Sequence, residues 1–246
     1  MSSYPTLIIF VGGQGDSQAE QMVAGAQHAI TLDTIERAEA TGAFDRIIVA
    51  TDSTALAGRV GPSVTVELDS GPFHFGRRLR ELIVGYDVTL PFYIGGGAGA
   101  LFTAEDLAAI AGQLMSAKNA VITNNLFSAD MVAFTPASAI DRIELPDIDN
   151  SLAQLLRRQA ELEDLQLERN AATQFDVDTP ADLLVLKVHQ RAGRHTREFL
   201  STLTLDVSRL RAAMLHLTDP LAEVLVAGRV GSYVWAHLEK DTACRV

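Results

Sequence analysis

The sequence is poor in cysteine and has no long apolar run. Its one cysteine, Cys244, excludes an internal disulfide and any cysteine-rich metal site. No apolar run approaches the roughly 18 residues that a membrane-spanning helix needs. The N-terminus also lacks the basic region with which a signal peptide begins. We therefore expect a cytoplasmic protein with no membrane partner.

Basic residues are scarce as well. The chain has 20 Lys and Arg against 31 Asp and Glu, which gives a net charge of -11. An acidic chain without a long basic run is a poor candidate for binding nucleic acid, so we expect no nucleic-acid partner. The remaining composition is that of an ordinary globular protein: 246 residues, 48% of them hydrophobic, are enough for a sizeable core.

Apolar runs alternate with helical stretches along the first 191 residues. The runs cover residues 6–11, 46–51, 64–68, 90–94, 119–123 and 131–135, and helical periodicity covers 18–41, 76–86, 103–116, 150–168 and 180–191. This alternation predicts an α/β domain over 1–191 with three layers, in which a mostly parallel sheet carries helices on both faces. In such a sheet, ligands bind at the carboxyl ends of the strands.

Residues 192–246 are predicted to form a helical C-terminal extension. An apolar seam recurs there at helical spacing, at Leu203, Val207, Leu210, Met214 and Leu217. A helix docked on its own domain explains the seam, and a homodimer through residues 199–217 is the alternative. The chain ends at "TACRV" without a polar tail, so the extension could belong to a further unit that is cut short.

Two glycine-rich loops follow predicted strands. In "GGQGDS", Gly12, Gly13 and Gly15, with Gln14 between them, would let backbone N–H groups approach a ligand, and the next helix adds positive charge that suits phosphate. A plain turn from strand to helix is the alternative. The loop is neither a dinucleotide fingerprint nor a Walker loop. The second loop, "GGGAGAL" around Gly97, implies close backbone contact with a partner.

Polar side chains follow two further strands. "GPFHFGRRLREL" carries Arg77 and Arg78, with His74 between two phenylalanines, and guanidinium groups bind phosphate or carboxylate. A solvated, ion-paired helix face and a packed histidine are the alternatives. "TNNLFSAD" places Asn124 and Asn125 after another strand, where amides could bind a base or a sugar, or form a turn.

The stretch "QFDVDTPADLLVL" combines a helix start with two unexplained carboxylates. Thr179 is a good N-cap and Pro180 suits the first helical position, so "TPAD" is explained locally. Asp176 and Asp178 lie two residues apart, and on a strand they would point the same way. Two carboxylates on one face repel unless a cation lies between them, and Mg²⁺ prefers such oxygen ligands. Two solvated aspartates at a sheet edge are the alternative.

Together these segments resemble the nucleotidyltransferases with the GT-A-like, nucleotide-diphospho-sugar transferase fold. Among them, the chain is similar to the molybdenum-cofactor guanylyl- and cytidylyltransferases and the phospholactate guanylyltransferases. The resemblance covers about residues 5–187 and rests on the first glycine loop, "DRIIVATD", "GGGAGALFTAEDL" and "FDVDTPADL". The last is the most specific, because Asp-x-Asp-Thr-Pro-x-Asp-Leu recurs in this family at the metal side of the site.

The resemblance implies transfer of a nucleoside monophosphate from a nucleoside triphosphate (NTP) to a small phosphorylated acceptor, with release of pyrophosphate. The glycine loops with Asn125 would bind the nucleotide, and His74, Arg77 and Arg78 would bind the anionic substrate. Asp178 would hold the Mg²⁺ cofactor, with Asp176 as the second catalytic residue.

The sequence departs from the family in two places. The first glycine loop lacks the Arg and Lys that contact the triphosphate, and Ala98 replaces the first metal aspartate. Arg77 and Arg78 could replace the missing cation, and Asp52 or Asp130 the missing carboxylate. Two other functions therefore stay open: a catalytically degenerate module that binds nucleotides or sugar nucleotides, and a glycosyltransferase with a nucleotide-sugar donor.

Overall fold

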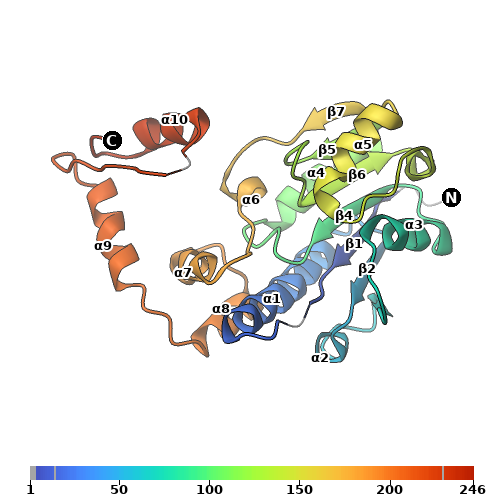
Figure 1. Ribbon diagram of the computed structural model, residues 1–246, viewed down its shortest axis with the longest axis horizontal. Helices are drawn as coiled ribbons and strands as arrows, with labels where there is room; N and C mark the ends of the chain where they lie inside the picture. Colours follow the sequence, from blue (N-terminus) through green and yellow to red (C-terminus); the bar gives the residue numbers. More distant parts are fainter. Residues whose placement is uncertain (1–3, 14, 229) are drawn as a thin grey trace.

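The computed structural model describes residues 4–13, 15–228 and 230–246 (Figure 1). Its strands are β1 (Thr6–Phe10), β2 (Arg46–Thr51), β3 (Thr65–Leu68), β4 (Pro91–Gly95), β5 (Ala120–Thr123), β6 (Met131–Thr135) and β7 (Glu163–Gln166). Its α-helices are α1 (Gln18–Thr41), α2 (Thr54–Ala57), α3 (Phe75–Gly85), α4 (Ala104–Ser116), α5 (Leu152–Gln159), α6 (Ala171–Gln174), α7 (Pro180–Val188), α8 (Arg194–Ser201), α9 (Ser208–Leu217) and α10 (Ser232–Asp241). Two 3₁₀ turns, η1 (Ala137–Arg142) and η2 (Asp149–Ser151), precede α5.

The seven strands form one sheet in the order β3-β2-β1-β4-β6-β5-β7. β1 pairs in parallel with β2 and β4, whereas β6 runs antiparallel to both of its neighbours. The α/β class and the mostly parallel sheet predicted from the sequence are therefore confirmed. All six predicted strands are present, each within a residue of its predicted bounds.

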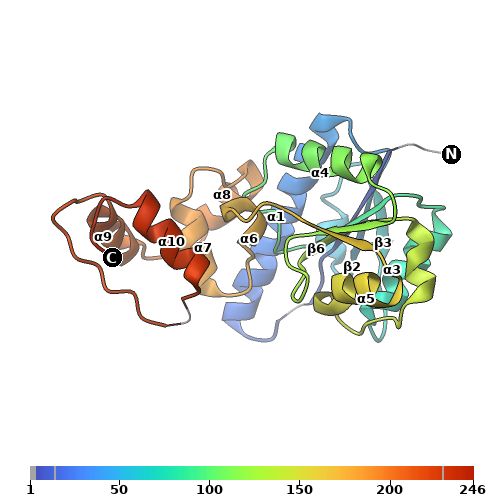
Figure 2. The same cartoon turned by 90° about the horizontal axis from the view of Figure 1, so that it is seen from above.

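Two separate cores lie on the two faces of the sheet. Because successive side chains of a strand point to opposite faces, Leu7 and Ile9 pack with α1, α4, α7 and α8, while Ile8 and Phe10 pack with α3, η1 and α5. Figure 2 shows α1 and α4 on one side of the sheet and α3 and α5 on the other. The arrangement is the predicted three-layer one.

Side-chain caps determine where three of the long helices begin. Ser17 and Glu20 form a reciprocal capping box at the start of α1, and Thr103 and Asp106 form one at α4. At α7 the hydroxyl of Thr179 donates to Asp182 Oδ2 at 2.8 Å, and Pro180 is the first helical residue. The local explanation of "TPAD" is thus confirmed.

Two local predictions are wrong. The helix predicted over 150–168 ends at Gln159, and β7 follows as an edge strand parallel to β5. β7 has the sequence "EDLQ" and lacks the apolar run of a buried strand, so no strand was predicted there. The segment around Asp176 and Asp178 is also no strand, although its alternation persists: Val177 is fully buried between the two aspartates.

The C-terminal extension is helical, but the predicted seam is not one helix. α8 ends at Ser201 and α9 begins at Ser208, so Leu203 and Val207 lie in the connection and pack inward, while Met214 is 44% exposed. α8 packs on α1. Figures 1 and 2 both show α9 and α10 away from the sheet. None of the described helices is long and apolar enough to cross a membrane.

Candidate functional site

The loops singled out in the sequence meet at one edge of the sheet. β1, β2, β3, β4 and β5 all point their carboxyl ends to this edge, and the antiparallel β6 begins there. The glycine loops therefore lie beside Asp52, which follows β2, and Asp130, which precedes β6. This is the edge at which α/β sheets bind ligands.

The segment with the two aspartates reaches this edge through backbone contacts. The Val177 N–H donates to the carbonyl oxygen of Gly97 at 3.2 Å, and the Val177 carbonyl accepts from Gln27 Nε2 at 2.8 Å. A Cβ on Gly97 would lie 2.5 Å from Asp176 Oδ1. Gly97 is therefore needed as glycine, because it lets the carboxylate of Asp176 approach the β4–α4 loop.

Four carboxylates gather at this point, and we call them the acidic cluster: Asp130, Asp149, Asp176 and Asp178. Asp149 is the first residue of η2, and its Oδ2 accepts a hydrogen bond from the Tyr93 hydroxyl at 2.7 Å. The Ala129 N–H donates to the carbonyl of Asn150 and thereby joins the β5–β6 loop to η2. In the described part of the chain, no Lys, Arg or His forms an ion pair with these four carboxylates.

The cluster shifts the acidity of its own members. Burial and the charge of Asp130, followed by that of Asp178, raise the pKa of Asp176 to about 7. Burial also raises the pKa of Asp130, against a hydrogen bond from Asn124 that lowers it. Burial and the neighbouring Asp149 raise the pKa of the Tyr93 hydroxyl well above its ordinary value. Unpaired negative charge is thus concentrated at a site of restricted solvent access.

The acidic cluster supplies the oxygen ligands that a hard divalent cation prefers. In the described structure no three of its carboxylates have oxygen atoms within 4.8 Å of one another, so the cluster offers one or two ligands at a time, as is usual for Mg²⁺. Mg²⁺ binds carboxylate oxygens and also accepts phosphate oxygens from a substrate. The chain supplies an oxygen-only set of side chains, and the glycine at position 97 gives Asp176 the space it needs. Asp130, rather than Asp52, lies with Asp176 and Asp178. Ala98 supplies no ligand atom, and its methyl group packs in the core.

A pocket of about 560 Å³ lies between the first glycine loop and the loop after β3. Its walls include Gly12, Gly13, Asp52, Asp69 and the side chain of Phe73, which is 57% exposed. The backbone N–H of Gly13 donates to both oxygens of Asp52, at 3.3 and 3.2 Å. The Gly13 N–H, which the sequence predicts as a donor to phosphate, is therefore occupied by the Asp52 carboxylate.

A second pocket, of about 300 Å³, connects the first glycine loop with the acidic cluster. Gly13 lines both pockets, and the second is also lined by Gly15, Gln27 and Asp178. Among the described residues, neither pocket is lined by a Lys or an Arg. Gln14, one of the predicted nucleotide-binding residues, lies outside the described residues.

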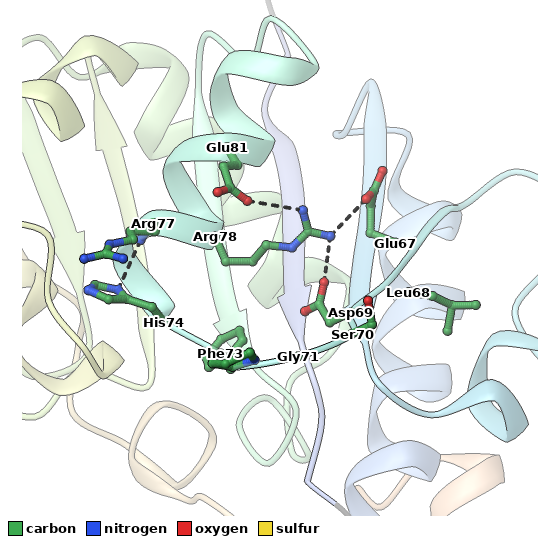
Figure 3. A pocket seen from close by; sticks show the side chains of 11 residues that line it. Glu67, Leu68, Asp69, Ser70, Gly71, Phe73, His74, Arg77, Arg78 and Glu81 are labelled. Carbon is green, nitrogen blue, oxygen red and sulfur yellow. Dashed lines mark hydrogen bonds and ion pairs between the residues drawn. The ribbon is translucent and has the colours of Figure 1, made fainter.

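The predicted anion-binding residues His74, Arg77 and Arg78 line one pocket of about 450 Å³, but the two arginines differ in their ion pairs. Arg78 forms ion pairs with Asp69 at 2.7 Å and Glu67 at 2.9 Å, and a longer one with Glu81 at 3.7 Å. Figure 3 shows its guanidinium directed toward these carboxylates and away from His74. Arg77 is exposed instead. Because its charge is already compensated, Arg78 is better explained as the residue that holds the loop after β3.

His74 and Asn125 have local structural contacts. His74 is the N-cap of α3, where its Nδ1 accepts from the Arg77 N–H at 3.4 Å, and its Nε2 lies 3.1 Å from Asp147 Oδ1. The Oδ1 of Asn125 accepts from the Phe127 N–H at 3.1 Å in a turn. The turn at Asn125 corresponds to the alternative that the sequence left open, whereas His74 caps a helix instead of packing in a core, and the ligand-binding roles of both residues stay predictions.

The sequence reading missed Asp149 and Tyr93. Tyr93 lies inside a buried strand, where an aromatic residue signals only packing. Asp149 belongs to "PDIDN", a second Asp-x-Asp pair, and that repeat of the pattern was an available signal. The sequence pattern does not indicate that η2 lies at the carboxyl edge of the sheet.

A second group of possible metal ligands lies outside this edge, at the contact of α1 with α8. The ligand atoms of Asp33, Glu36 and His195 are all within 4.8 Å of one another. The buried Asp33 already accepts from the backbone N–H groups of His195 and Thr196 at 2.8 and 2.9 Å and from the Thr196 hydroxyl. Glu36 pairs with Arg194 at 2.6 Å. These bonds attach the start of α8 to α1.

Known structures share this architecture at low sequence identity. A protein from Desulfovibrio desulfuricans described as a nucleotide-diphospho-sugar transferase has a TM-score of 0.58 and 18% identity, over 84% of this chain and 100% of its own. A cytidylyltransferase from Leptospira borgpetersenii has a TM-score of 0.56 and 12% identity, over 93% and 100%. A CMP:2-keto-3-deoxy-manno-octonic acid synthetase complexed with CTP has a TM-score of 0.52 and 16% identity, over 75% and 97%.

No known protein family matches the chain by sequence, and no curated protein does so either. The structural matches establish the nucleotide-diphospho-sugar transferase fold, as the sequence resemblance predicted. They leave the chemistry to be inferred from the site itself.

Proposed function

We propose that the protein transfers a nucleoside monophosphate from an NTP to a small phosphorylated acceptor and releases pyrophosphate. The observation that supports this most directly is the bond from Val177 to Gly97, which brings Asp176 and Asp178 to the glycine loops. Gly13 lines both the pocket beside Gly12 and the smaller pocket, and the smaller pocket is also lined by Asp178 of the acidic cluster.

A nucleotide would occupy the two pockets in one orientation, with its base in the larger pocket and its phosphates in the smaller one. The larger pocket, with Phe73 at its rim, offers an aromatic face for a base. The smaller pocket begins at Gly13 and ends at Asp178, so it suits the phosphates. The negative phosphates would then meet the acidic cluster only with a cation between them.

The reaction itself requires little of the protein beyond position and charge. A phosphate oxygen of the acceptor attacks the α-phosphorus, the bond from that phosphorus to the bridging oxygen breaks, and pyrophosphate leaves. The attacking oxygen is ionised at neutral pH, so no side chain needs to remove a proton. When bound, Mg²⁺ neutralises the charge that develops on the phosphate oxygens. Asp176 and Asp178, together with Asp130, are the residues that would hold it.

The test is pyrophosphate release by the full chain. ATP, GTP, CTP and UTP are each supplied with Mg²⁺ and a panel of phosphorylated small molecules. We expect release with one NTP and one class of acceptor, and its loss in Asp178→Ala with the fold intact by circular dichroism. Release from a nucleotide sugar of the nucleoside diphosphate alone would indicate a glycosyltransferase instead.

A second candidate function is a nucleotide-binding module without catalysis. It is favoured by Asp52, which occupies the N–H of Gly13, and by the lack of Lys and Arg among the described residues that line the two pockets. Thermal stabilisation by an NTP with Mg²⁺, together with a blank acceptor panel, would support this module. The absence of stabilisation by every NTP would contradict both functions.

A further inference from the structure

Asn124 is a buried amide that joins two segments beside the acidic cluster. It follows β5 and is 4% exposed. Its Nδ2 donates to Asp130 Oδ2 at 3.0 Å and to the carbonyl of Thr173 at 3.1 Å. Its Oδ1 accepts from the Asp130 N–H at 3.3 Å. The three partners fix the orientation of the amide, because only the nitrogen can donate to a carboxylate and a carbonyl.

The two segments carry the two sides of the cluster. Asp130 lies directly before β6, and Thr173 belongs to α6, three residues before Asp176. Asn124 lies between them and holds Asp130 against the segment that continues into Asp176 and Asp178. The backbone of Asn124 is held in turn by Gln174, whose Nε2 donates to its carbonyl at 3.2 Å.

Closure of the β5–β6 loop does not require this amide. Thr123 pairs with Val132 in the sheet, and the Thr123 hydroxyl donates to the Met131 carbonyl at 3.0 Å. A buried amide is costly unless its hydrogen bonds are made, so an apolar residue would be the simpler choice for packing alone. What the amide adds is a fixed position for one oxygen of Asp130.

We propose that Asn124 is the positioning residue of the cation site and acts through Asp130. Thr173 anchors the amide, and the amide holds the Asp130 carboxylate where it can share a cation with another carboxylate of the acidic cluster. This inference rests on the proposed function, because it takes the acidic cluster to bind a divalent cation. Groups that orient a metal ligand typically change metal affinity 10–100-fold when they are removed.

The test measures Mn²⁺ binding to the full chain by electron paramagnetic resonance, without nucleotide. Asn124→Ser is expected to weaken Mn²⁺ binding at least tenfold. Thr123→Val is the matched control: at the adjacent buried residue, the last of β5, it removes the hydroxyl that bonds to Met131 and Asn125 without touching Asp130, and it should leave the Mn²⁺ affinity within twofold of wild type. Both proteins are first compared by near-ultraviolet circular dichroism, and Asn124→Gly replaces Asn124→Ser if the latter does not fold.

A double-mutant cycle decides whether Asn124 acts through Asp130. In an Asp130→Asn background, Asn124→Ser should change the Mn²⁺ affinity less than twofold. An equal loss in Thr123→Val, or a full tenfold further loss in the Asp130→Asn background, would overturn the positioning role and leave the proposed function intact. If the wild-type protein itself binds no Mn²⁺, the positioning role and the metal assignment are both wrong. NTP binding in the absence of any cation would separately show that the metal assignment is wrong.

Discussion

Val177 donates its backbone N–H to the carbonyl of Gly97, and these two residues lie 80 positions apart in the chain. The bond places Val177 in the core and leaves Asp176 and Asp178 on either side of it, at the carboxyl edge of the sheet. A side chain at position 97 would occupy the space that Asp176 uses. The first prediction follows from this contact.

Gly97→Ala is expected to displace Asp176, because the added Cβ would lie 2.5 Å from its Oδ1 and 2.9 Å from the Val177 carbonyl. Overpacking of this kind costs about 1–3 kcal/mol of unfolding free energy. Mn²⁺ affinity should fall at least tenfold, as measured by calorimetry. Gly112→Ala in α4 is the control, since its Cβ would meet no atom within 4 Å. If Gly97→Ala binds Mn²⁺ as wild type does, Asp176 is no part of the cation site.

The raised pKa of Asp176 predicts that the stability of the cation-free protein depends on pH. The carboxyl has an ordinary value of 3.8 and a folded value of about 7, so the native state binds the extra proton between these pH values. This contribution to stability is therefore greatest below about pH 4 and falls as the pH rises to 7, by at most about 4 kcal/mol. Urea unfolding of wild type and Asp176→Asn across this range should show a flatter profile for the variant. Parallel profiles would contradict the shift, and added Mg²⁺ should stabilise the wild type most at neutral pH.

Arg77 and Arg78 are adjacent, and we expect opposite consequences when each is replaced by glutamine. Arg78→Gln leaves Glu67 and Asp69 facing each other without their shared cation, so it should cost about 1–3 kcal/mol of stability. Arg77→Gln should change stability by less than about 0.5 kcal/mol, since Arg77 is exposed. If Arg77 binds the anionic substrate, its variant raises the KM for the acceptor. An unchanged KM would remove Arg77 from the site.

The bonds of Asp33 predict that it attaches α8 rather than holding a metal. Asp33→Ala leaves the half-buried N–H of His195 and the buried N–H of Thr196 without acceptors and should cost about 2–4 kcal/mol by urea unfolding. Glu36→Gln, at a half-exposed ion pair, should cost less than about 1 kcal/mol. A chelator that lowered the melting temperature of wild type but not of Glu36→Gln would instead indicate a metal at this place.

The dimer predicted through residues 199–217 stays a prediction, and exposed apolar side chains lie both in α9 and further along the chain in α10. Leu215 and Val234 are 70% and 51% exposed, and the side chain of Trp235 is 38% exposed. Contiguous exposed apolar patches mark interaction sites, and these three side chains belong to α9 and α10. Sedimentation should show association that Leu215→Glu abolishes. Leu68→Glu, at the end of β3, is the control and should leave the association unchanged. If the wild-type protein stays monomeric at about 100 µM, the dimer is excluded.

Local patterns in the sequence were sufficient for the fold. Buried parallel strands are apolar along their whole length, and helices begin at Ser17, Thr103 and Thr179 because these side chains bond to their own first turns. Such signals come from residues within a few positions of each other, so one sequence contains them. β7 was not predicted, because an edge strand is partly exposed and its sequence carries little apolar pattern.

The composition of the site was decided by contacts between distant residues. The sequence identified Asp176 and Asp178 and suggested Asp130, but only the fold shows that η2 brings Asp149 beside them and that Asn124 bonds to Asp130. It likewise could not show that Asp52 takes the N–H of Gly13 or that Arg78 is paired with Asp69. Backbone pattern is a property of neighbours in the chain, whereas charge compensation depends on which segments the sheet brings to one edge.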